Sequence, residues 1–175
     1  GILKNYDSAI SKARKDGLKI REEIFQSSYK RLGNKDATSI EYIEILPSRK
    51  KKLDGVIISF NQEAGLFQEE SSDLLTLAKK SNMAVVSFNY PKGATSAEEV
   101  IQVATELSKT YADDFGLTRT VLHGSSIGGA FATYVAENLN SDVLGQVDFD
   151  RKSVSLVTDR SFVDISQLVR GYTTV

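Results

Sequence analysis

The sequence predicts a single α/β domain built as a three-layer αβα sandwich with a mostly parallel sheet. From residue 39 onward, short apolar segments rich in β-branched residues alternate with longer amphipathic segments. Most connections between the apolar segments are long enough to hold a helix, and crossovers of that length join parallel strands. A chain of 175 residues is also long enough to bury a core of its own.

An N-terminal helical segment, residues 1–34, is expected to precede a core of residues 35–175. Apolar residues over 3–32 recur at spacings of three and four, which predicts helix with one apolar stripe, divided in two at Gly17. We expect this stripe to cover one face of the sheet or to dock on a partner. In the core, the predicted strands span 39–48, 55–60, 83–90, 120–123 and 153–162, and the predicted helices span 67–82, 96–116 and 127–139.

Composition excludes several classes of function. The 22 basic and 23 acidic residues leave a net charge of −1, which gives no support to nucleic-acid binding. With no cysteine and one histidine, His123, the chain cannot form disulfides, cysteine–zinc sites or histidine-rich metal clusters, and no metal or cofactor is expected. The basic run Arg49–Lys52 is typical of a solvated turn, with contact to a membrane surface or a partner as the alternative.

The sequence shows no targeting or membrane-spanning segment. No run of 18 apolar residues occurs, and the first residues lack the apolar region of a signal peptide. The lack of cysteine is compatible with a cytoplasmic location. Because the chain begins with glycine rather than methionine, we expect a cleaved or excised piece of a longer protein.

The segment "VLHGSSIGGAFATYVAEN", residues 121–138, has the pattern of a nucleophile elbow. Gly124 and Gly128 flank Ser126 at minus two and plus two, between a predicted buried strand and a predicted helix. Small residues at these positions let the strand and the helix approach closely, and the strained turn exposes the serine hydroxyl. The backbone amide of Ile127, at the start of the helix, is then placed to stabilise an oxyanion.

Two alternatives to this assignment remain. The segment could be a purely structural turn, or a glycine-rich loop for phosphate, although neither G-x-x-x-x-G-K-[ST] nor G-x-G-x-x-G is present. Ser125 is the weaker nucleophile candidate, because Ile127 rather than glycine follows it at plus two.

These motifs resemble the alpha/beta-hydrolase serine lipases of the Bem46-like and phosphatidylserine-lipase-like group, over about Ile40–Gly171. The similar stretches are "GSSIGGAFATYVAEN", "LVTDRSFVDISQLV" with its D-x-S-F pattern, and "VIISFNQEAGLFQE". The resemblance implies an ester or lipid substrate and a second oxyanion donor, the backbone amide of Glu63. Gln62 and Glu63 stand where the group has glycine and asparagine, whereas Ala64 and Gly65 match.

A catalytic serine needs a base, usually a histidine oriented by a carboxylate. His123 precedes Ser126 by three residues on the predicted strand, which favours a packed or hydrogen-bonded structural role. Asp159 is a candidate for the acid, although a turn or cap at the strand end is its favoured role. Asp164 is predicted to begin a helix.

Triad residues in the alpha/beta-hydrolase fold follow the order serine, acid, histidine. The resemblance therefore implies an N-terminal portion of a hydrolase domain, truncated before the last strands and the histidine. The sheet edge left by those strands would favour self-association. Three interpretations stay open: a serine ester hydrolase, a catalytically inactive hydrolase-like binding or scaffold domain, and a small nucleotide-binding domain, which the missing phosphate motifs disfavour.

Overall fold

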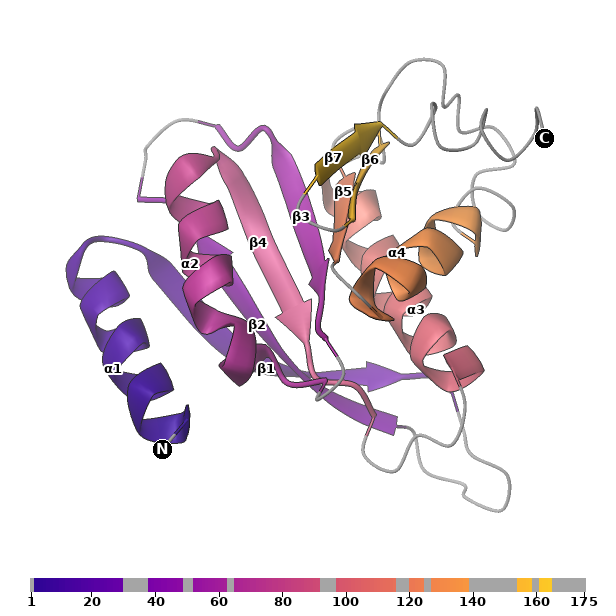
Figure 1. The fold of residues 1–175 in the computed structure, drawn as a ribbon, viewed down its shortest axis with the longest axis horizontal. Coiled ribbons are helices and arrows are strands. Elements are labelled where there is room, and N and C mark those ends of the chain that lie inside the picture. The colour runs from indigo at the N-terminus through magenta and orange to yellow at the C-terminus, as the bar shows by residue number, and fades with distance from the viewer. Residues whose placement is uncertain are drawn as a thin grey trace.

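The computed structural model describes residues 2–29, 38–48, 52–62, 65–91, 97–115, 120–124, 127–138, 154–158 and 161–164. Within these ranges seven strands form one sheet in the order β1-β2-β4-β3-β5-β6-β7 (Figure 1). The strands are β1 (Lys19–Ser27), β2 (Thr38–Leu46), β3 (Gly55–Phe60), β4 (Met83–Phe88), β5 (Thr120–Gly124), β6 (Val154–Thr158) and β7 (Ser161–Asp164). Strands β4, β3, β5 and β6 pair in parallel, and β2 and β7 are antiparallel to their neighbours.

Helices cover both faces of the sheet, which confirms the predicted three-layer architecture (Figure 1). The helices are α1 (Ile2–Lys15), the 3₁₀ turn η1 (Phe67–Glu70), α2 (Ser71–Lys80), α3 (Ala97–Phe115) and α4 (Ile127–Asn138). Buried side chains of α1 and α2 pack on one face, and those of α3 and α4 pack on the other. The apolar stripe of α1, formed by Tyr6, Ile10 and Ala13, is buried on the sheet, as expected for the N-terminal helix.

The central strands are apolar on both faces because both faces are covered. All six residues of β3 are buried. Val56 and Ile58 point toward α3 and α4, whereas Ile57 lies with α1 and α2. This alternation explains why β3 and β4 read as continuous apolar runs in the sequence. It also fixes which face each polar residue at the strand ends will occupy.

The predicted helix over 3–32 is wrong for residues 19–27, because they form β1, and residues 30–32 lie outside the described ranges. This strand pairs with β2 along its full length, from Lys19 opposite Leu46 to Ser27 opposite Thr38. Gly17, two residues beyond the end of α1, has a φ of +99°, a conformation that favours glycine. The apolar pair Ile20 and Ile24 misled the prediction, because a spacing of four places two residues on one face of a strand as well as of a helix.

The predicted strand over 153–162 is also wrong, because it is two strands. β6 and β7 pair antiparallel, with Leu156 opposite Val163, and only two residues connect them. Antiparallel partners need no more than such a short connection. Asp164 is the last residue of β7, and the helix predicted to begin there would fall on residues outside the described ranges.

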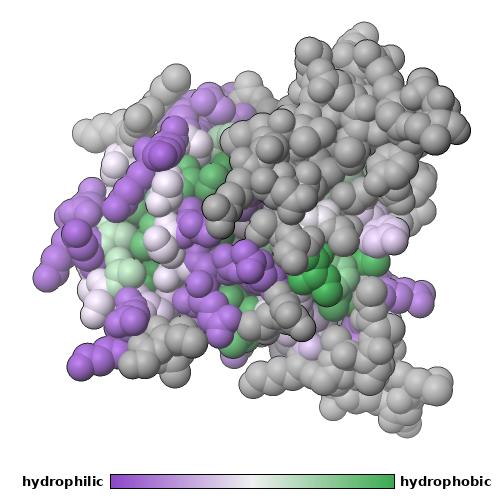
Figure 2. Space-filling view, in the orientation of Figure 1, coloured by the Kyte–Doolittle hydropathy of each residue, from purple (hydrophilic) through white to green (hydrophobic). Residues whose placement is uncertain are grey.

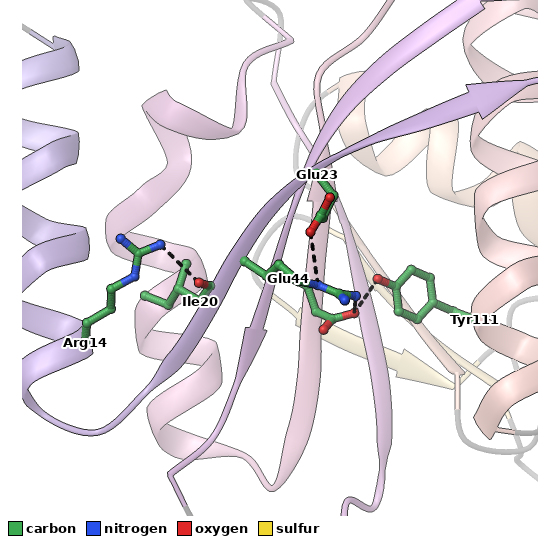
Figure 3. A network of polar contacts seen from close by, with 6 residues as sticks. Arg14, Ile20, Glu23, Glu44 and Tyr111 are labelled. Atoms are coloured by element: carbon green, nitrogen blue, oxygen red, sulfur yellow. Dashed lines mark hydrogen bonds and ion pairs between the residues drawn. The ribbon is translucent and has the colours of Figure 1, made fainter.

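A polar network joins β1 and β2 to α3 (Figure 3). Glu44 on β2 accepts a hydrogen bond from the Tyr111 hydroxyl of α3 at 2.6 Å and from the Arg21 guanidinium of β1 at 3.3 Å. Burial and the neighbouring Glu44 carboxylate raise the pKa of Tyr111, so its phenol stays protonated and keeps donating. The network fixes β1 and β2 against the helical layer.

The surface around α1 is mainly hydrophilic. In Figure 2 purple side chains cover most of the left side, where α1 lies in Figure 1, and apolar side chains show between them. The exposed residues of α1 include Lys4, Asp7, Lys12 and Lys15. Among the helices that the structure describes, none is long and apolar enough to cross a membrane.

Candidate active site

The elbow glycines lie where the end of β5 meets the start of α4. A Cβ on Gly124 would lie 2.7 Å from the Gly129 nitrogen and closer still to the Gly128 carbonyl. A Cβ on Gly128 would lie 2.8 Å from the Asn61 carbonyl oxygen and closer still to that of Phe60. Both positions therefore require glycine, because any side chain would collide with backbone that cannot rotate away.

The two candidate nucleophiles, Ser125 and Ser126, lie outside the described residues. The structure describes both sides of this turn: β5 ends at Gly124, and α4 begins at Ile127. A strand that is followed after two residues by a helix is the arrangement that a nucleophile elbow requires. The N-terminus of a helix also carries positive potential, which suits a developing oxyanion.

The turn after β3 lies next to this elbow, since β3 and β5 are parallel neighbours with Phe60 opposite Gly124. Gly65 has a φ of +70°, and its amide donates to the Gln62 carbonyl at 2.9 Å. The Gln62 amide donates to the Glu70 carboxylate at 3.2 Å. Glu63, the predicted second oxyanion donor, lies outside the described residues, as does Ala64.

Buried polar residues hold the ends of β3 and β4 together. Asn61 is 1% exposed, and its side-chain amide donates to the Phe88 carbonyl at 2.6 Å. The Ser87 hydroxyl lies 2.9 Å from the Ser59 carbonyl oxygen and 3.0 Å from Asn61 Oδ1. These bonds fix the backbone from which the turn after β3 departs, since buried polar groups need partners.

The hydrogen bonds among Ser59, Asn61 and Ser87 were not predicted from the sequence. A signal was present, because β3 and β4 both end in Ser-Phe after an apolar run, in "GVIISF" and "MAVVSF". Ser59 and Ser87 are direct partners in the parallel register. A polar residue at the same place in two neighbouring buried strands indicates a shared hydrogen-bond row.

His123 continues this row on β5, opposite Ser59. Its Nδ1 lies 2.8 Å from the Ser59 hydroxyl oxygen, so the predicted hydrogen-bonded role at the strand end is confirmed. Burial lowers the pKa of His123 below its ordinary value, and the Asp73 carboxylate of α2 acts in the opposite direction. Burial therefore favours the neutral imidazole, whose Nδ1 is engaged with β3.

The candidate acids cannot be placed relative to the elbow. Asp159 lies outside the described residues, and Asp164 is known only by its backbone position at the end of β7. Among the residues that the structure does describe, no three carboxylate or histidine side chains gather into a group that could hold a metal ion.

Comparisons with known proteins identify the fold. No protein-family model and no curated protein matches the sequence. An esterase from Pyrobaculum calidifontis superposes with a TM-score of 0.61 at 15% identity, over 80% of this chain and 46% of that chain. An alpha/beta hydrolase enzyme from the metagenome of Lake Arreo gives 0.56 at 18% identity, over 77% and 45%.

A thermostable esterase from Pseudomonas putida gives a TM-score of 0.56 at 18% identity, over 81% of this chain and 46% of that chain. The described part of the chain has a mostly parallel central sheet with helices on both faces, and α4 begins close after β5. This chain therefore has the fold of the alpha/beta hydrolases, and it spans less than half the length of these three structures.

Proposed function

We propose that the protein is a serine ester hydrolase in which Ser126 is the nucleophile. The observation that carries this proposal is the contact between the elbow glycines: Gly124 and Gly128 leave no room for a Cβ where β5 meets α4. The backbone amides of Ile127 and Glu63 are the proposed oxyanion donors. They would stabilise the negative charge that develops on the carbonyl oxygen when Ser126 attacks the ester.

The substrate class follows from the sequence resemblance to the Bem46-like and phosphatidylserine-lipase-like group. We propose that the substrate is an acyl ester or a lipid. A lipid substrate would require the enzyme to work at or near a membrane surface. Two of the structural neighbours described above are esterases and the third is an alpha/beta hydrolase, which supports the same reaction class.

The general base must come from outside the described site. His123 is the single histidine of the chain, and its Nδ1 is bound to Ser59 on the sheet face that packs against α1 and α2. We therefore propose that the catalytic histidine, and the acid unless it is Asp159, are supplied by sequence beyond these 175 residues.

Fluorophosphonate labelling of the longest natural form of the protein tests this proposal. The probe phosphonylates an activated serine, so we expect one labelled residue, and peptide mapping should place the label on Ser126. Labelling at Ser125, or no labelling of the folded protein, would contradict the proposed function.

A second candidate is a catalytically inactive hydrolase-like domain that binds a ligand or partner. One observation favours it: the single histidine is used to join β3 and β5. If the longest natural form lacks a second histidine and binds no fluorophosphonate, this candidate replaces the first.

A further inference from the structure

Tyr90, two residues beyond the end of β4, contacts both ends of the turn after β3. Its backbone amide donates to the Gly65 carbonyl at 2.9 Å, and its hydroxyl donates to the Asn61 carbonyl. Its ring lies so close to Gly65 that a Cβ there would be 2.6 Å from Tyr90 Cδ2. Tyr90 thus holds the start and the end of this turn, and Glu63 lies between them in the sequence.

Tyr90 also contacts the helix that follows the elbow. Its ring packs edge-to-face on Phe131 of α4, with the ring centroids 5.2 Å apart. The Asn61 carbonyl that receives the Tyr90 hydroxyl is the one that faces Gly128. One side chain therefore joins both ends of the turn after β3 to α4, the two elements to which the sequence assigns the proposed oxyanion donors.

We propose that Tyr90 is a positioning residue that sets the separation between the two oxyanion donors, the turn containing Glu63 and the N-terminus of α4. This inference rests on the proposed function and adds to it a residue that touches neither the substrate nor the nucleophile. Oxyanion stabilisation depends on donors fixed in advance at hydrogen-bond distance, so a small displacement of one segment lowers the rate of the chemical step.

The chemistry of Tyr90 suits this role. Burial raises the pKa of its phenol, and the Glu70 carboxylate acts in the same direction. The hydroxyl therefore stays protonated and remains a donor to the Asn61 carbonyl at every pH at which a serine hydrolase would work. The aromatic contacts with Phe88 and Phe131 fix the ring, so the hydroxyl is held in one place.

The test is Tyr90→Phe in the longest natural form, assayed on a p-nitrophenyl ester. Phenylalanine keeps the ring contacts and loses only the bond to Asn61. We expect kcat to fall about tenfold with KM unchanged, less than the roughly 10²–10³-fold loss that follows removal of an oxyanion donor itself. Amide hydrogen exchange at Gly65 should also become faster in this variant, because the turn is held less tightly.

Tyr111→Phe is the matched control, since it also deletes a tyrosine hydroxyl bond, the one to Glu44, between other elements. Its kcat should equal that of the unmodified protein. The inference is overturned if Tyr90→Phe keeps full kcat, or if both variants lose kcat equally. If the unmodified protein shows no Ser126-dependent hydrolysis, the proposed function fails first, and the role of Tyr90 fails with it.

Discussion

The Ser59–His123 hydrogen bond joins β3 to β5 at the end of the sheet that carries the elbow. The two residues are direct partners in the parallel register, and His123 is followed at once by Gly124. Ser59 is 5% exposed. The bond therefore connects the residue that precedes the elbow to the centre of the sheet, and it gives the buried Ser59 hydroxyl a partner in the half-buried imidazole.

Burial of His123 should make stability depend on pH. Its pKa is lowered in the folded protein, so the unfolded chain binds a proton at higher pH than the folded chain does. The neutral imidazole contributes fully to the free energy of unfolding above 6.5, the ordinary pKa of histidine. This contribution is lost as the pH falls below that value. We expect the free energy of unfolding, measured with urea, to decrease between about pH 7.5 and pH 5.5.

His123→Asn separates this effect from other titrations. The asparagine Oδ1 can accept from Ser59 in place of Nδ1 but does not titrate. The variant should show a weaker pH dependence over the same interval, because the chain contains no other histidine. An identical slope in the variant and the unmodified protein would show that His123 does not titrate on unfolding.

At the scale of elements, the approach of α4 to the sheet depends on Gly128. Gly128→Ala places a Cβ against the carbonyl oxygens of Phe60 and Asn61, and neither can move without displacing β3. We expect a loss of about 1–3 kcal/mol in the free energy of unfolding, the range typical of overpacking. Urea unfolding measures this loss. Ser11→Ala on the exposed face of α1 is the control, expected to change stability by less than ~0.5 kcal/mol.

If Gly128→Ala is as stable as the unmodified protein, α4 does not pack on the ends of β3 and β5 as described. The same substitution should displace the start of α4, so esterase activity should fall with stability. If Gly128→Ala loses activity without losing stability, the substitution acts on the segment between β5 and α4 and not on the packing of α4.

The elements with strong periodicity were predictable from the sequence. β3 was predicted at its observed bounds, and β4, β5 and the three core helices were predicted to within a few residues. β1 was missed because Ile20 and Ile24 fit both periods, and only pairing with β2 decides between them. The hairpin of β6 and β7 was missed although a signal was present, because the polar residues Thr158–Ser161 interrupt the apolar run where the chain reverses.

The candidate site likewise contains features that the sequence predicts and features that it does not. The requirement for glycine at Gly124 and Gly128 followed from a local motif, and the contacts of both residues agree with it. Tyr90 and Asn61 could not be predicted, because their contacts join residues 29 apart in the sequence. The outcome for Ser126 and Glu63 stays a prediction, since both lie outside the described residues.

At the scale of the whole molecule, the 175-residue chain alone should show little turnover. Positioned general-base catalysis contributes typically about 10²–10⁴-fold, and the only histidine is bound to Ser59. This chain should therefore hydrolyse a p-nitrophenyl ester no faster than its own Ser126→Ala variant. A rate well above that of the variant would mean that a base within these residues had been overlooked.

The edges of the sheet predict self-association of the isolated chain. β1 and β7 are the outer strands of the described sheet. β1 carries charged residues such as Arg21 and Glu23, which oppose strand addition, so we expect association on the β7 side. Sedimentation velocity should show a concentration-dependent dimer, and a single monomeric species at every concentration would contradict this expectation.

The central claim, that Ser126 attacks an ester, is tested most directly by ester hydrolysis in the longest natural form of the protein. Ser126→Ala and its neighbour Ser125→Ala remove one hydroxyl each from the same turn, so they share any effect on folding. The account predicts that Ser126→Ala abolishes hydrolysis, whereas Ser125→Ala keeps most of it. Activity that survives in Ser126→Ala, or that is lost equally in both variants, would contradict it.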